Sequence, residues 1–120
     1  MSITLAELGE TELLDRLARF APPGQLDDDT AMLPPDSRAL LVNTDVMVES
    51  VHFSDATTAP ADVGWRAVVA NLSDLAASGS EQVEGITVSL VAPGTTSWWW
   101  VEQVYQGISE ALEHFGGTLL

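Results

Sequence analysis

Hydrophobic residues recur every three or four positions in three segments of the chain, and this spacing predicts three amphipathic helices. The first covers residues 10–20. The second is capped by Thr58 and ends at Gly79, and the third is capped by Ser97 and ends at Gly116-Gly117. In the third helix the expected buried stripe is Trp98, Val101, Tyr105, Ile108 and Leu112.

The second predicted helix has two faces of different character. Its hydrophobic stripe consists of Trp65, Val68, Leu72 and Leu75. A separate face carries Asn71 and Asp74 together with small residues. An aspartate on a helix usually faces water. The absence of long charged neighbours on this face makes Asp74 a candidate for a binding role.

Other hydrophobic runs predict strands between the helices. Residues 39–42 (ALLV) form a continuous run, which is typical of a strand buried on both faces. Residues 46–53 are expected to be extended, and residues 85–91 alternate between hydrophobic and polar side chains as a half-buried strand does. Strands that alternate with helices predict a mixed α/β or α+β domain.

Composition and charge narrow the class of protein. The chain has 120 residues and is 46% hydrophobic, which predicts one folded domain. Eighteen acidic residues against four arginines and no lysine give a net charge of -14, which excludes a basic patch for nucleic acid or an anionic membrane. No leader-like segment and no hydrophobic run of membrane-spanning length is visible, so we expect a cytoplasmic protein.

Aspartates stand at the ends of predicted elements. Asp27-Asp28-Asp29 precedes a short extended piece, Asp45 follows the hydrophobic run, and Asp74 lies on the second helix. Each one alone is explained by a solvated loop, a turn or an exposed helix face. Brought together, they would repel one another unless a cation were bound, and Mg²⁺ prefers such oxygen ligands. This sequence has no phosphate-binding loop of the lysine type, so metal ions would have to bind the phosphate groups of any nucleotide.

Three segments carry a resemblance to a known family. QLDDDTAM (25–32), NTDVMVESVHF (43–53) and WRAVVANLSDLAASG (65–79) resemble the N-terminal motifs of the thiamine-monophosphate kinase family, and the opening LGETELLDRL is similar to that family's start. The family belongs to an ATP-binding superfamily shared with selenophosphate synthetase and aminoimidazole ribonucleotide synthetase. The resemblance implies that residues 1–120 are an N-terminal ATP-binding domain, with helices packed on one face of a mixed β-sheet.

The resemblance also implies a reaction and its residues. The γ-phosphoryl group of ATP would pass to thiamine monophosphate, giving thiamine diphosphate, with several Mg²⁺ ions between protein and phosphates. The acceptor phosphate is already anionic near neutral pH, so no catalytic acid or base is expected. Residue by residue, the implied ligands of metal are Asp28, Asp29, Asn43, Thr44, Asp45 and Asp74, with His52 on the thiamine phosphate and Tyr105 near the nucleotide. A homodimer formed through the sheets is implied as well.

Three departures from the family pattern affect these expectations. Arg66, on the second predicted helix, stands where the family frequently has lysine. Asp27 stands where the family commonly has glycine, and the chain stops just before the family's Gly-Gly-Asp-Thr nucleotide motif and its C-terminal domain. Residues 1–120 alone are therefore expected to be inactive. Two alternatives stay open: another phosphotransferase or synthetase of the superfamily, and a non-catalytic metal-binding dimerisation module.

Overall fold

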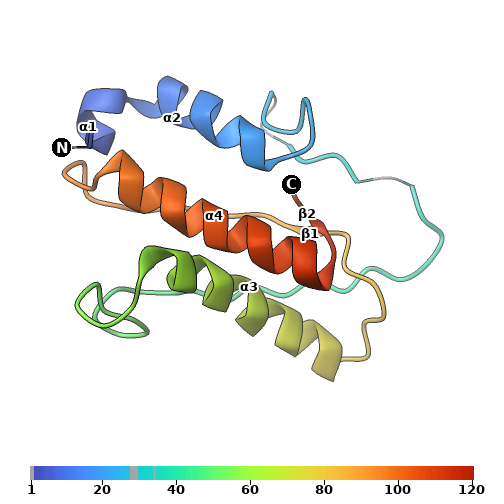
Figure 1. Ribbon diagram of the computed structural model, residues 1–120. Helices are drawn as coiled ribbons and strands as arrows, with labels where there is room; N and C mark the ends of the chain where they lie inside the picture. Colours follow the sequence, from blue (N-terminus) through green and yellow to red (C-terminus); the bar gives the residue numbers. More distant parts are fainter. Residues whose placement is uncertain (1, 28–29, 34) are drawn as a thin grey trace.

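The computed structural model describes residues 2–27, 30–33 and 35–120. In Figure 1 the long helix α4 lies between α2 on one side and α3 on the other, and the short strands lie beside the C-terminal end of α4. The elements in chain order are α1 (Leu5–Leu8), α2 (Glu10–Leu17), the 3-10 helix η1 (Ala18–Phe20), α3 (Pro60–Ala77), β1 (Gly85–Ile86), α4 (Trp98–Phe115) and β2 (Thr118–Leu119).

The three predicted helices are present. Together α2 and η1 cover residues 10–20, and α4 begins after Ser97, whose hydroxyl accepts a hydrogen bond from the Trp100 backbone N–H at 3.2 Å. The start of α3 corrects one prediction, because its N-cap is Ala59 and not Thr58. Pro60 occupies the first turn, where its fixed φ suits a helix and its missing N–H needs no cap.

The hydrophobic core forms along α4. All five residues of its predicted stripe are buried, and Val101 meets Val68 of α3 in the same cluster, each with 0% of its surface exposed. The backbones of α3 and α4 are in direct contact where they cross. A Cβ atom at Gly64 would lie 1.9 Å from the Val104 carbonyl oxygen, and one at Gly107 would lie 1.8 Å from that of Ala61. Only glycine fits at these two positions.

The sheet is small and parallel. Gly85 pairs with Thr118 and Ile86 with Leu119, so β1, α4 and β2 form a β-α-β unit in which α4 is the crossover connection. Gly116 and Gly117, with φ of 98° and 91°, turn the chain from α4 directly into β2. The predicted strand over 85–91 is thus confirmed only at its first two residues.

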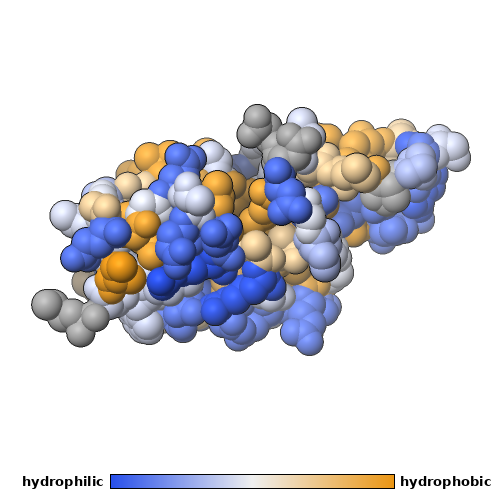
Figure 2. Space-filling view, turned by 90° about the horizontal axis from the view of Figure 1, so that it is seen from above, coloured by the Kyte–Doolittle hydropathy of each residue, from blue (hydrophilic) through white to orange (hydrophobic). Residues whose placement is uncertain are grey.

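The expected mixed sheet is wrong for the described part of the chain, where the one sheet has two parallel strands. Residues 39–42 form no strand, and Leu40, Leu41 and Val42 are 58%, 46% and 79% exposed. A strand needs a neighbour to pair its backbone groups, and no such neighbour reaches this run among the described residues. Figure 2 shows hydrophobic side chains on the surface among hydrophilic ones.

None of the helices in residues 2–27, 30–33 and 35–120 combines the length and hydrophobicity needed to cross a bilayer. The helices and the small sheet place the domain in the α/β class that the alternating pattern predicted.

Candidate functional site

A side-chain hydrogen bond brings two of the predicted motifs together. The Asn43 Nδ2 donates to the Asn71 Oδ1 at 3.1 Å, and both residues are partly buried. Asn71 in turn donates from Nδ2 to the Ala67 carbonyl one turn earlier in α3, at 2.8 Å. Asp74 follows Asn71 by three positions and so lies on the same side of α3. The segment 43–45 is therefore fastened beside the helix face that bears Asp74.

The predicted metal ligands in this region are mostly open to solvent. Thr44, Asp45 and Asp74 are exposed, and the Asp45 Oδ1 accepts a hydrogen bond from the Val46 backbone N–H at 2.8 Å. Within the described ranges, no three histidine, aspartate or glutamate side chains are grouped closely enough to hold a metal ion. The donors present are carboxylate, amide and hydroxyl oxygens, which is the set that suits a hard cation.

Two of the predicted ligands cannot be placed. Asp28 and Asp29 lie outside the described residues, and their predicted role in metal binding stays a prediction. The nearest described aspartate of that run is Asp27, which is exposed.

His52 lies in a tight loop with a dense set of local hydrogen bonds. The Val48 N–H donates to the His52 Nδ1 at 3.0 Å, and the His52 N–H donates to the Val48 carbonyl at 2.8 Å. The Ser50 N–H donates to the Phe53 carbonyl at 2.7 Å, and Ser50 has a left-handed φ of 65°. The imidazole of His52 is exposed, and one of its two ring nitrogens is held by the loop's own backbone.

Two helices anchor this loop at the histidine and just after it. The Arg66 Nη1, on α3, donates to the His52 carbonyl at 3.0 Å. The Trp100 Nε1, on α4, donates to the Asp55 Oδ1 at 3.0 Å, and the Trp100 ring stacks on Phe53 with 6.2 Å between centroids. The quoted motifs contain His52 and Arg66, but no local pattern links position 52 to positions 66 and 100.

Tyr105 is part of the hydrophobic core. Its side chain packs against the Phe20 ring at 5.7 Å between centroids, and burial raises the pKa of its phenol to about 12. The same residue belongs to the predicted buried stripe of α4, so the helical pattern explains its position. The nucleotide contact that the family resemblance implied for Tyr105 stays a prediction.

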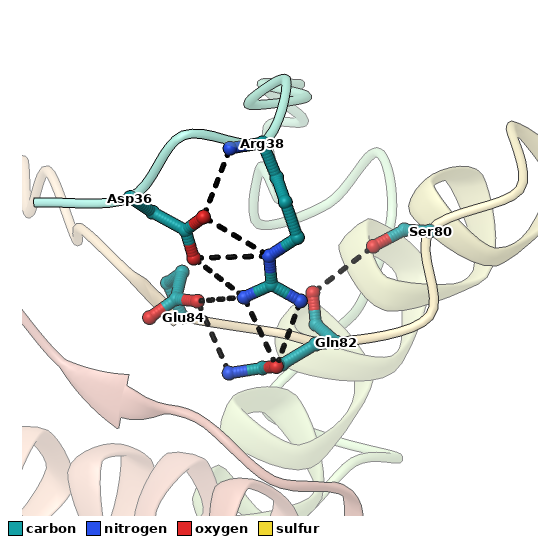
Figure 3. A network of polar contacts seen from close by, with 5 residues as sticks. All are labelled: Asp36, Arg38, Ser80, Gln82 and Glu84. Carbon is teal, nitrogen blue, oxygen red and sulfur yellow. Dashed lines mark hydrogen bonds and ion pairs between the residues drawn. The ribbon is translucent and has the colours of Figure 1, made fainter.

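A polar network that the sequence reasoning missed fastens residues 36–38 to the segment before β1 (Figure 3). The Arg38 guanidinium donates to both carboxylate oxygens of Asp36 and to the Gln82 Oε1 at 3.3 Å. The Gln82 Nε2 donates to the Glu84 Oε1 at 3.1 Å. Hydrogen bonds from the side chain and backbone of Arg38 lower the pKa of Asp36 to about 2.

The described residues also border two surface hollows. One of about 330 Å³ is bordered by Phe20, Leu112 and Leu119, and a shallower one of about 710 Å³ lies between Thr4 and Trp99. Neither is lined by a predicted site residue. The candidate site is therefore an exposed surface made of the 43–45 segment, the His52 loop and the polar side of α3.

Known proteins match nearly the whole chain. Residues 27–120 match the family model described as AIR synthase related protein, N-terminal domain. A thiamine-monophosphate kinase of Prochlorococcus marinus is 55% identical over 116 residues, which are 97% of this chain and 35% of that protein. The thiamine-monophosphate kinase of Synechococcus elongatus is 48% identical over 118 residues, 98% of this chain and 36% of that protein.

A more distant relative extends the same pattern. The thiamine-monophosphate kinase of Aquifex aeolicus is 36% identical over 111 residues, 92% of this chain and 36% of that protein. The chain spans about a third of the length of the curated relatives it matches.

Proposed function

The chain belongs to the family of AIR synthase related proteins, of which it carries the N-terminal domain, and on this premise we propose that it acts within a longer protein as part of a thiamine-monophosphate kinase. The proposed reaction transfers the γ-phosphoryl group of ATP to thiamine monophosphate. The observation that carries this proposal is the 55% identity over 97% of the chain to a protein of that name. Chain length supports the role of one domain among several, because the relatives are about three times longer.

We further propose that Asp28, Asp29, Asn43, Thr44, Asp45 and Asp74 hold Mg²⁺. The hydrogen bond between Asn43 and Asn71 supports this, since it fixes the 43–45 segment beside the face of Asp74. Bound Mg²⁺ would neutralise and align the phosphate groups of the two substrates. Without cations, a chain with a net charge of -14 would repel both substrates.

The exposed hydrophobic residues 40–42 support a homodimer in which strands of two copies of the chain pair with each other. Leu40, Leu41 and Val42 are exposed although their sequence is that of a buried strand, and Val46 and Val51 nearby are 64% and 73% exposed. A second copy of the chain that paired strands here would cover them. We propose this surface as the dimer contact.

The test uses a chimera in which this chain is followed by the remaining two thirds of the Prochlorococcus marinus relative. We expect Mg²⁺-dependent formation of thiamine diphosphate from thiamine monophosphate and ATP, and no turnover of selenide or formylglycinamidine ribonucleotide. A folded chimera that binds Mg²⁺ but phosphorylates none of the three would favour the non-catalytic metal-binding module. Turnover of one of the other two acceptors would assign the chain to another branch of the superfamily.

The metal ligands are tested in the same chimera by substitutions that remove the carboxylate charge and keep the side-chain size. Asp45→Asn and Asp74→Asn are each expected to raise the Mg²⁺ concentration for half-maximal activity by roughly tenfold or more. The matched control is Asp62→Asn, which removes the same charge from the exposed first turn of α3 and is expected to have little effect. Equal behaviour of Asp74→Asn and Asp62→Asn would contradict the proposed metal site.

A further inference from the structure

We propose that the loop 48–53 holds the neutral imidazole of His52 in the tautomer that carries its proton on Nε2, and that Arg66 and Trp100 are the positioning residues that keep this tautomer. In this arrangement His52 offers one hydrogen-bond donor, Nε2–H, to an anionic oxygen of the substrate. The identity of that substrate rests on the proposed function, whereas the state of the imidazole rests on the contacts of the loop alone.

The hydrogen bond at Nδ1 fixes the tautomer. The Val48 backbone N–H is a donor and cannot accept, so the His52 Nδ1 at 3.0 Å from it must be the acceptor and carry no proton. A neutral imidazole with a bare Nδ1 carries its proton on Nε2. The Nε2 atom takes part in no hydrogen bond within the described ranges, so this donor is left for a ligand.

The backbone of the loop is built to hold this geometry. A left-handed φ of 65° at Ser50 is uncommon for a residue other than glycine, asparagine or aspartate, and it is maintained here by the bridge between Glu49 and Phe53. The N–H groups of Val51 and His52 both donate to the Val48 carbonyl, at 3.1 and 2.8 Å. Val48 therefore accepts two backbone hydrogen bonds of the loop through its carbonyl and donates one to the imidazole through its N–H.

Arg66 and Trp100, which lie on different helices, both hold the C-terminal end of this loop. Arg66 binds the carbonyl of His52 itself, so it fixes the peptide that carries the ring. Trp100 binds Asp55 and stacks on Phe53, so it fixes the chain immediately after the ring. The two helices that carry these anchors are in close backbone contact with each other at Gly64 and Gly107.

A neutral N–H donor suits a phosphate monoester on this strongly acidic surface. It can bind an anionic oxygen through a charge-assisted hydrogen bond without itself carrying a charge. Glutamine places a side-chain NH2 group near the position of Nε2, whereas the shorter asparagine reaches only to the position of Nδ1. We therefore expect His52→Gln to retain part of the affinity for the substrate and His52→Asn to lose it.

The decisive experiment is a long-range proton–nitrogen NMR spectrum of the chimera labelled with ¹⁵N-histidine, recorded without substrate at a pH where imidazoles are neutral. His52 is assigned by the loss of its signals in His52→Gln. We expect a bare, hydrogen-bonded Nδ1 and a protonated Nε2. His114, whose ring contacts are the aromatic rings of Trp65 and Phe115, serves as the internal reference and should show averaged tautomers.

The anchors are tested by pairs of variants. Arg66→Gln removes the guanidinium and leaves a shorter side chain whose NH2 group ends short of the His52 carbonyl, and Trp100→Phe removes the Nε1 donor but keeps an aromatic ring on Phe53. Both should move the His52 signals toward averaged tautomers and raise the KM for thiamine monophosphate roughly tenfold, which corresponds to about 1.4 kcal/mol, with kcat little changed. Arg16→Gln and Trp99→Phe are the controls outside the loop and should leave the spectrum and the KM unchanged.

Three outcomes would overturn the inference. A protonated Nδ1, or averaged signals for His52 in the parent chimera, would contradict the fixed tautomer whatever the enzyme does. Parental spectra for both Arg66→Gln and Trp100→Phe would remove their positioning role, and Arg66→Lys, which keeps a donor, checks that any loss is not simple unfolding. A chimera that does not phosphorylate thiamine monophosphate would contradict the proposed function but would leave the tautomer result standing.

Discussion

Two hydrophobic parts of this chain differ sharply in burial. The stripe of α4 is buried in full and packs against α3, and Val68 of α3 and Val101 of α4 have no exposed surface. The run at residues 39–42 consists entirely of hydrophobic residues, yet Val42 is 79% exposed and no strand forms there. The difference arises from where each element finds partners for its backbone.

A helix satisfies its backbone hydrogen bonds within itself, so it can form before it packs. A strand must find them on a neighbour, and the neighbour can come from a distant part of the chain or from another molecule. Among the described residues the helices therefore have their packing partners, whereas residues 39–42 have no strand to pair with.

Gly107→Ala should disrupt the helical region most. The added Cβ would lie 1.8 Å from the Ala61 carbonyl oxygen, so α3 and α4 would have to separate. We expect a loss of about 3 kcal/mol or more in the free energy of unfolding, measured by urea denaturation. Ser73→Ala, on the exposed side of α3, is the control and should change stability by less than about 0.5 kcal/mol. A small effect of Gly107→Ala would show that the helices are less closely packed.

Removing the same two methyl groups from each region should give unequal losses. Val68→Ala leaves a cavity in the core and is expected to cost about 2 kcal/mol. Val42→Ala, at an exposed position, is expected to cost less than about 0.5 kcal/mol in the monomer. Sedimentation should show that Val42→Ala weakens self-association instead. Equal destabilisation by both would mean that residues 39–42 are already buried in solution.

Ser97→Ala tests the start of α4 with a smaller change. The Ser97 hydroxyl caps the helix by accepting from the Trp100 N–H, so its loss is expected to cost about 1 kcal/mol in thermal or urea unfolding. Ala59→Ser at the start of α3 is the informative counterpart, because that helix has no side-chain cap and should gain stability. No change in either variant would contradict the capping interpretation.

The weakest change in stability is expected from the polar network of Asp36, Arg38 and Gln82, which attaches residues 36–38 to the segment before β1. The pKa of Asp36 is lowered to about 2 from its ordinary 3.8, so its contribution to folding is present above pH 3.8 and is lost as the pH falls toward 2. An NMR titration of the Asp36 carboxyl carbon should have its midpoint near the lower value. In Arg38→Gln the midpoint should return toward the ordinary value, and amide hydrogen exchange at residues 39–42 should speed up. An unchanged midpoint would show that the network does not form in solution.

The sequence predicted the helices well and the strands poorly, for the same physical reason. The stripe from Trp98 to Leu112 is read from one segment and is confirmed in full. Residues 39–42 are correctly recognised as hydrophobic, but a pattern cannot tell whether the pairing strand is present in the chain. The extra helix α1, with its capping box of Thr4 and Glu7, is too short for a periodic pattern to reveal.

The sequence identifies residues of the candidate site but does not predict the contacts between them. Asn43 and Asn71 lie in motifs that were recognised, and the structure joins them by a hydrogen bond. The anchors Arg66 and Trp100, and the network around Arg38, depend on the path of the chain in space and so have no signature within one segment. The roles of Asp45, Asp74 and His52 stay predictions until metal and substrate are bound.

The turn at Gly116 and Gly117 has a consequence for anyone who recombines this domain with others. A Cβ at Gly117 would lie 2.8 Å from the Val83 side chain, and both glycines have left-handed φ values. A fusion junction or an inserted tag placed between α4 and β2 would therefore disrupt the pairing of β1 with β2 as well as lengthen the connection. Domain exchanges should join the two chains after Leu119, because the pairing of Leu119 with Ile86 is then retained.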